Sequence, residues 1–218
     1  MTSAGRDIPD QTLGCMNETT TATSHRHDHA LQERRLGVGG HLLARWPSVL
    51  GLLALLSNAA GGAESHLVGM IIITASMCYL AAAALGSRRA GWIMIGVSVV
   101  VILATGLLGL DKTAAILVVG GGFAIFGFLR GTAIDRRELG LQVAAFVGFG
   151  SLALAAMMSA PLLSMYLAAA AAIGHAVWDV IYFLRKKVVE RSVTEFCFVL
   201  DLGLGIALLL TAWNLLPL

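Results

Sequence analysis

Apolar residues dominate the chain from position 42 onward, in runs long enough to cross a lipid bilayer. A helix rises about 1.5 Å per residue, so about 20 apolar residues span the hydrocarbon core. Seven such runs, separated by short polar linkers, occupy residues 42–60, 67–86, 91–110, 113–129, 140–159, 162–184 and 193–214. The pattern predicts an all-α, polytopic transmembrane helix bundle with seven spans over residues 37–218.

The first run is the weakest of the seven, and a second interpretation of it stays open. Arg45 and Pro47 lie near its start. Arg45, the apolar stretch 49–56 and the small residues at 57–63 together resemble a signal peptide with its cleavage region. Cleavage there would leave six spans.

Residues 1–36 differ sharply from the rest, because they are polar and contain no Phe, Trp or Tyr. Such a segment buries too little apolar surface to offset its conformational entropy, so we expect a disordered polar tail. His25, His27 and His29 alternate beside Asp28, a pattern that binds metal ions weakly in flexible tracts. An ordinary polar tail is the favoured interpretation.

Composition supports the membrane class. Hydrophobic residues make up 57% of the chain and charged residues 13%, whereas soluble domains carry about 25% charged residues. No basic block with interleaved aromatic residues occurs, which argues against nucleic acid as a partner. Cys15, Cys78 and Cys197 are far apart and form no CxxC motif, which argues against a disulfide framework or zinc ribbon.

Basic residues are distributed on alternate linkers. Of the 15 lysines and arginines, only Lys112 follows an odd-numbered span. The others lie in the N-terminal region, up to the start of the first span, or after spans two, four and six: Arg6, Arg26, Arg34, Arg35, Arg45, Arg88, Arg89, Arg130, Arg136, Arg137, Arg185, Lys186, Lys187 and Arg191. The positive-inside rule then predicts a multi-pass protein of the plasma (cytoplasmic) membrane, with the N-terminus and tail in the cytoplasm and the C-terminus outside.

The stretch "IGHAVWDVIYF" at 173–183 carries ionisable residues inside the sixth span. His175, Asp179 and Tyr182 stand at i, i+4 and i+7, on one helix face. Measured from Arg185, Asp179 lies about 9 Å deep and His175 about 15 Å deep. An ionisable group there costs about 3 kcal/mol on insertion scales, so these side chains are expected to face protein or water.

The seventh span supplies matching residues. Asp201 lies about 13 Å below Ser192, at nearly the depth of His175, and Cys197 stands one turn above Asp201. If the two faces meet in an antiparallel hairpin, a contact between His175 and Asp201 would stabilise the imidazolium and the carboxylate together. Glu195 follows Arg191 by four residues, so a surface ion pair is favoured over a role in a site.

Three functions fit this constellation. The first is proton- or cation-linked movement of a small solute, with His175, Asp179, Asp201 and Tyr182 as relay residues and weaker roles for Glu195 and Cys197. The second is a structural or accessory membrane protein with a buried polar network. The third is a membrane-embedded metal enzyme that uses His175, Asp179 and Asp201 as ligands.

The metal enzyme is the least favoured of these, because no HExxH motif and no second intramembrane histidine occur. Nucleophile and nucleotide motifs such as GxSxG and the P-loop do not occur either. The expected partners are the lipid bilayer, a small solute or proton, and a second copy or another membrane protein. The sequence does not identify a cofactor.

Overall fold

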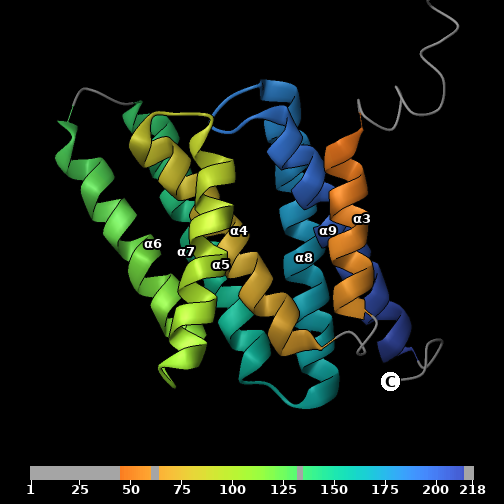
Figure 1. Cartoon of the computed structure of the whole chain (residues 1–218). Helices are drawn as coiled ribbons and strands as arrows, with labels where there is room; N and C mark the ends of the chain where they lie inside the picture. The colour runs from red at the N-terminus through yellow and green to blue at the C-terminus, as the bar shows by residue number, and fades with distance from the viewer. Residues whose placement is uncertain (1–44, 60–63, 132–134, 214–218) are drawn as a thin grey trace, which may run out of the picture. The chain divides into compact units, whose positions relative to one another are not determined.

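The computed structural model describes residues 45–59, 64–131 and 135–213, and all regular secondary structure in these ranges is helical. Seven helices follow one another (Figure 1): α3 (Trp46–Ala59), α4 (Ser65–Leu85), α5 (Ala90–Leu107), α6 (Lys112–Leu129), α7 (Arg136–Met157), α8 (Pro161–Arg185) and α9 (Arg191–Ala212). The predicted all-α class is therefore confirmed. The expected tail at 1–36, with His25, His27 and His29, lies outside the described residues.

Six of these helices, α4 to α9, are long and apolar enough to cross a membrane, as a multi-pass membrane protein requires. Helix α3 is apolar but has 14 residues. At 1.5 Å per residue it is about 21 Å long, which is short of a hydrocarbon core of about 30 Å. The first three residues of the predicted first span, 42–44, lie outside the described ranges, so the count of seven spans stays a prediction.

Helix ends follow local sequence signals. Asp135 caps α7, because its side chain accepts hydrogen bonds of 3.1 Å from the backbone N–H groups of Arg137 and Glu138. This cap starts α7 at Arg136 rather than at the expected position 140. Gly86 ends α4 with a φ of 63°, the left-handed conformation that glycine adopts without steric cost.

Helix α4 lies at the centre of the bundle and contacts all five helices from α5 to α9 (Figure 1). Its side chains are buried along most of its length, and Ile72, Ile73, Met77 and Leu80 are fully buried. By contrast, only a minority of the α5 and α6 residues are buried, and their exposed side chains are nearly all apolar, as lipid-facing helices require. The core is therefore organised around α4.

Helices α8 and α9 form an antiparallel hairpin, joined by the short linker 186–190, and they pack closely. Gly205 of α9 permits this approach. A Cβ atom at position 205 would lie 2.7 Å from the side chain of Ile173 on α8. Small residues let transmembrane helices approach closely in this way, and the approach occurs beside His175.

Helix α3 runs parallel to α9 along its outer side. The hydroxyl group of Ser48 donates a hydrogen bond to Glu195 at one end of the contact, and Leu55 packs against Gly203 further along. The carboxylate of Glu195 therefore faces α3. Arg191, its expected ion-pair partner, has its guanidinium group 4.7 Å from the centre of the Phe183 ring.

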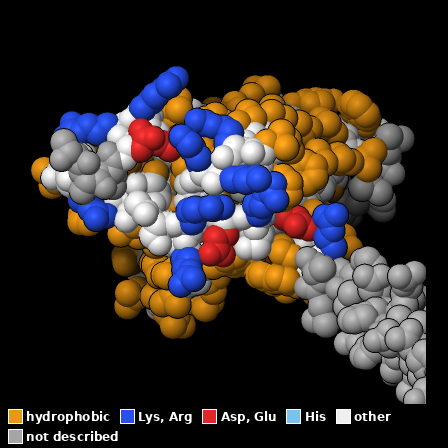
Figure 2. Space-filling model, turned by 90° about the horizontal axis from the view of Figure 1, so that it is seen from above, with side chains coloured by type: hydrophobic (Ala, Val, Ile, Leu, Met, Phe, Trp, Pro, Cys, Tyr) orange, Lys and Arg blue, Asp and Glu red, His pale blue; other side chains and the backbone are white. Residues whose placement is uncertain are grey.

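The linkers α4–α5, α6–α7 and α8–α9 meet at one end of the bundle, which we call the basic end. Arg130 donates a hydrogen bond of 2.8 Å to the Leu85 carbonyl, and Arg88 donates one of 3.4 Å to the Val189 carbonyl. Figure 2 shows the lysine and arginine side chains gathered on this end. At the other end, Lys112 lies in a pocket with Glu64, His66 and Asp111.

Candidate functional site

Three ionisable side chains meet inside the bundle, and we call His175, Asp179 and Asp201 the central trio. His175 Nδ1 lies 2.8 Å from Asp201 Oδ2 across the α8–α9 contact and 3.5 Å from Asp179 Oδ2 on its own helix. All three residues are fully buried. The inner faces of the two helices therefore do meet at these residues.

The local sequence of α8 explains why the trio is enclosed. Alanines fill the face of α8 that precedes His175, and Ala168, Ala169, Ala171 and Ala172 are all fully buried. Small side chains let neighbouring helices close over the site. The i, i+4 spacing of His175 and Asp179 then directs both polar groups to the same interior face.

Tyr79 of α4 is a fourth member of the buried site. Its hydroxyl group donates a hydrogen bond of 2.6 Å to Asp179 Oδ1, and its ring meets the His175 ring edge-on at 5.6 Å. Our sequence analysis did not identify this residue. The sequence does carry a signal for Tyr79, because the hydroxyl group of a tyrosine buried in a span usually needs a hydrogen-bond partner. The partner could not be identified from the sequence, because it lies 100 residues away.

Aromatic rings surround the trio. The Phe149 ring lies 5.2 Å from the His175 ring, and the Trp178 ring lies 6.2 Å from Phe149. Such surroundings exclude water and lower the local dielectric constant, which makes every unpaired polar atom costly. The free energy of the site therefore depends strongly on how its polar atoms are satisfied.

Several polar atoms of the trio lack a hydrogen-bond partner. These atoms are His175 Nε2, Asp179 Oδ2 and Asp201 Oδ1. A buried polar atom without a partner costs about 1–3 kcal/mol. The site therefore holds unused capacity to bind a proton, an ion or a water molecule.

The charge of the trio depends on how many protons it holds. With both carboxylates ionised and His175 neutral, the trio carries two negative charges inside an apolar bundle. Isolated buried charge is strongly unfavourable. Two protons, one proton with a monovalent cation, or one divalent cation would each make the trio neutral.

The trio also has the donor set of a metal centre. One ligand atom from each of His175, Asp179 and Asp201 can be chosen so that all three lie within 4.8 Å of one another. One imidazole nitrogen and two carboxylate oxygens suit a divalent transition metal, and three protein ligands are typical of catalytic sites. These residues are the ones that could hold such an ion.

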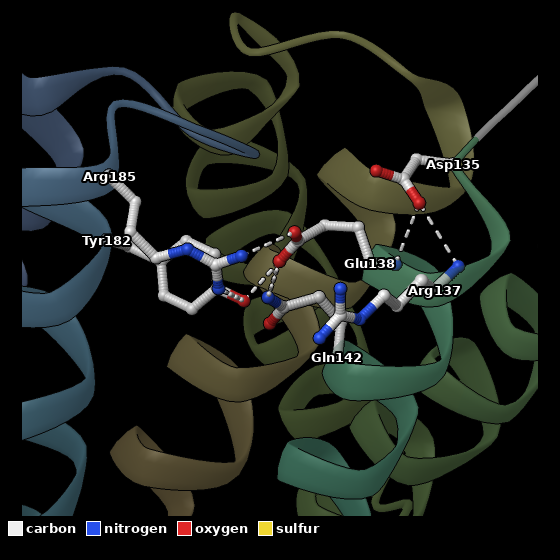
Figure 3. A network of polar contacts seen from close by, with 6 residues as sticks. All are labelled: Asp135, Arg137, Glu138, Gln142, Tyr182 and Arg185. Atoms are coloured by element: carbon white, nitrogen blue, oxygen red, sulfur yellow. Dashed lines mark hydrogen bonds and ion pairs between the residues drawn. The ribbon is translucent and has the colours of Figure 1, made fainter.

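A second polar cluster, the outer network, lies nearer the basic end than the trio does, because its α8 members Tyr182 and Arg185 follow Asp179 along the helix. Figure 3 shows how these two residues meet Glu138 and Gln142 of α7. Glu138 of α7 accepts a hydrogen bond from the Tyr182 hydroxyl group. Arg185 Nη2 lies 3.2 Å from Glu138 Oε2, and its Nη1 lies 3.2 Å from the Tyr182 oxygen. Gln142 Nε2 donates a longer bond of 3.5 Å to Glu138 Oε1. Glu138 is only 7% exposed, although our sequence analysis left it outside the spans.

The Tyr182 hydroxyl group therefore bonds within the outer network, and its ring meets the ring of Tyr79, which contacts the trio. The two tyrosine rings meet edge-on with their centroids 5.6 Å apart. Of the lower-ranked candidates, Glu195 faces α3. Cys197 is buried beside an apolar crevice of about 190 Å³, which Cys78 and Asp201 also line.

Comparisons of the chain with protein-family models, with curated proteins and with solved structures found no match. A fold alone does not determine function, which depends on the chemistry of specific sites. In this chain, that chemistry belongs to the trio and the residues around it.

Proposed function

We propose that this chain is a multi-pass protein of the plasma (cytoplasmic) membrane whose central trio binds and releases protons in step with movement of a small solute. The N-terminal tail and the basic end face the cytoplasm, α3 belongs to the first of seven spans, and the C-terminus lies outside. The one-sided gathering of basic residues supports this orientation.

The observation that carries the proposal is the mutual contact of three fully buried ionisable groups with unused polar atoms. Ionisable groups inside a membrane are rare, and they commonly mark ion or proton pathways. Histidine supports such a role, because its ordinary titration falls near neutral pH.

Coupling to movement follows from where the trio lies. Tyr79 belongs to α4, His175 and Asp179 to α8, and Asp201 to α9. A proton that binds the trio changes the attraction among these three helices. Binding can shift the populations of two helix arrangements only by its differential affinity for them, and a buried cluster at a helix junction provides that difference.

The proposal is tested by infrared difference spectroscopy of the protein in liposomes, titrated with pH. We expect a protonated-carboxyl band that changes with pH, is lost in Asp201→Asn and is altered in His175→Gln. In vesicles loaded with the pH indicator pyranine, an imposed pH gradient should drive proton entry into the vesicle through the wild-type protein but not through Asp201→Asn. Glu195→Gln is the matched control and should keep both signals.

Two results together would overturn the proton function: the wild-type protein shows no pH-dependent carboxyl band, and both trio variants only lower the melting temperature. The trio would then serve only to hold the helices together. That result would favour the structural or accessory protein, which the linkage of α4, α8 and α9 through Tyr79 and Asp201 also supports.

A metal centre is the second candidate, because the three ligand atoms lie within 4.8 Å of one another. Elemental analysis of the purified protein tests it directly. One bound metal ion per chain that is lost in Asp201→Asn would assign the trio to metal binding and would remove the proton function. Protein without stoichiometric metal after growth in metal-supplemented medium would remove the metal centre.

A further inference from the structure

The outer network and the central trio form one line of polar groups that runs inward from the basic end. We propose that Glu138 and Tyr182 form the route by which protons reach the trio, with Tyr79 as the gate between them. This inference rests on the proposed function and adds to it the route and the side of access.

A pocket of about 290 Å³ at the basic end forms the mouth of the route. Its lining consists of Ala82, Ala83, Gly86, Arg88, Asp135, Glu138, Lys187 and Val188. Water occupies about 30 Å³ per molecule in the liquid, so the pocket has room for several water molecules. Glu138 is the inner carboxylate of this mouth, because it is buried and bonds onward to Tyr182.

The backbone of the mouth is held in an uncommon conformation. Lys186 has a φ of 54° and Val188 a φ of 66°, in the left-handed region that β-branched residues rarely adopt. Residues held in this way are strained, and such residues cluster at functional sites. The strained linker therefore supports a functional role for the pocket that Val188 lines.

Each step of the route follows a contact in the structure, apart from one. The Tyr182 hydroxyl group bonds to Glu138, and the Tyr79 hydroxyl group bonds to Asp179 at 2.6 Å. From Asp179 the line continues to His175 at 3.5 Å and then to Asp201 at 2.8 Å. Between the two tyrosines only the rings touch, and no hydrogen bond joins their hydroxyl groups.

The tyrosine pair therefore acts as a gate. The gate opens when a tyrosine ring rotates so that the two hydroxyl groups meet, or when a water molecule bridges them. Protonated Glu138 then gives its proton to the Tyr182 oxygen, and the Tyr182 hydroxyl group releases its own proton inward. Tyr79 repeats this exchange and passes its hydroxyl proton to Asp179. Neither tyrosine gains or loses a proton overall, and the trio gains the one that Glu138 took from water.

The charges around the mouth select the proton over other cations. Arg88 and Lys187 line the pocket, and Arg185 pairs with Glu138, whereas the facing acids are Asp135 and Glu138. The mouth is therefore net positive, which repels hydrated metal cations. A proton escapes this barrier because it moves by exchange between hydrogen-bonded groups. The deeper groups that face the line are Tyr79 and Gln142, with Cys197 beside Asp201.

The experiment uses Trp178 as a reporter, because its ring contacts both Tyr182 and Phe149, next to His175. The other tryptophans, Trp46, Trp92 and Trp213, are changed to Phe. The protein is placed in liposomes of known orientation, and its fluorescence is followed after a rapid pH change on the side of the basic end.

We expect Glu138→Gln and Tyr182→Phe each to slow the fluorescence relaxation by about 100-fold, the size of effect that a positioned proton-transfer group typically has. The final amplitude should stay that of the reporter protein, because the trio is intact. Glu195→Gln is the control, since this glutamate also accepts a hydroxyl hydrogen bond, and its rate should be unchanged. Melting curves show which variants are folded.

The outcomes separate the route from the function. Unchanged rates in both Glu138→Gln and Tyr182→Phe, with full amplitude, overturn the route and leave the proton-binding trio in place. A reporter protein without any pH-dependent amplitude overturns the proposed function and the route together. Slow relaxation in Glu195→Gln as well would also overturn the route, because the effect would then not be specific to Glu138.

Discussion

The hydroxyl group of Tyr79 stabilises a carboxylate that is fully buried in the bundle. It donates to Asp179 Oδ1 at 2.6 Å, and the other oxygen of Asp179 has no hydrogen-bond partner. Removing one partner of a buried hydrogen bond leaves the other with its full desolvation cost. Tyr79 is therefore the residue at which the stability of the buried site is best tested.

We expect Tyr79→Phe to lower the free energy of unfolding by about 1–3 kcal/mol. Reversible unfolding in mixed micelles, with increasing SDS, measures this change. Tyr166→Phe is the matched control, because Tyr166 is 38% exposed on α8 and its change should stay within about 0.5 kcal/mol. Equal losses in the two variants would contradict a special role for the Tyr79 hydroxyl group.

Only part of the site could be predicted from single residues. The i, i+4 spacing placed His175 and Asp179 on one face, and the linker length placed Asp201 at a similar depth. Tyr79 and Glu138 were missed, because their contacts depend on which helices pack side by side. The apolar pattern of a span indicates that the span crosses the membrane, but it does not determine which other helices pack beside it.

At the scale of elements, the linker between α8 and α9 shows how local strain and packing compete. Helix α8 ends at Lys186 in the left-handed conformation, which costs a non-glycine residue about 1–2 kcal/mol. The linker nevertheless turns within five residues, 186–190, so that α9 returns beside α8. The close contact of the two helices offsets the strain.

Lys186→Gly should raise the free energy of unfolding by about 1 kcal/mol, because glycine adopts the left-handed conformation without steric cost. The same micelle unfolding assay measures the change. Lys187→Gly is the control, since Lys187 is exposed and lacks a positive φ, and it should not stabilise. Equal stabilisation by both would show that the backbone conformation at 186 is not the cause.

The positions of the helices were the most predictable feature, because a run of about 20 apolar residues between polar linkers leaves little freedom in where a membrane-spanning helix begins and ends. The start of α7 was predicted less well. Apolar character begins near position 140, but the Asp135 cap starts the helix at Arg136. That single turn brings Glu138 into the protein interior, which explains why its role was not foreseen.

For the whole molecule, the distribution of charge is the dominant feature. Three linkers meet at the basic end, and Arg88 and Arg130 join them through backbone carbonyls. At the opposite end, apolar residues such as Leu107 and Met158 are 89% and 87% exposed. This asymmetry predicts one orientation in the membrane.

The orientation is tested by labelling single cysteines in intact cells with a membrane-impermeant maleimide, after Cys15, Cys78 and Cys197 are changed to Ser or Ala. We expect Met158→Cys to react from outside. Ser87→Cys, in the linker at the basic end, should react only after the cells are permeabilised. The reverse pattern would contradict the proposed orientation, and labelling of both positions from outside would contradict the odd number of spans, α5, α6 and α7, between them.

The long separation between Tyr79 and Asp179 has a consequence for biosynthesis. The ribosome makes Tyr79 100 residues before its partner, so α4 enters the bilayer without the carboxylate that will accept its hydroxyl proton. The histidine and both aspartates arrive only with the last two helices. Because an unpaired ionisable group is costly in a membrane, we expect α8 and α9 to insert as one hairpin, with His175 already against Asp201. Tyr79 then gains its partner when this hairpin packs against α4.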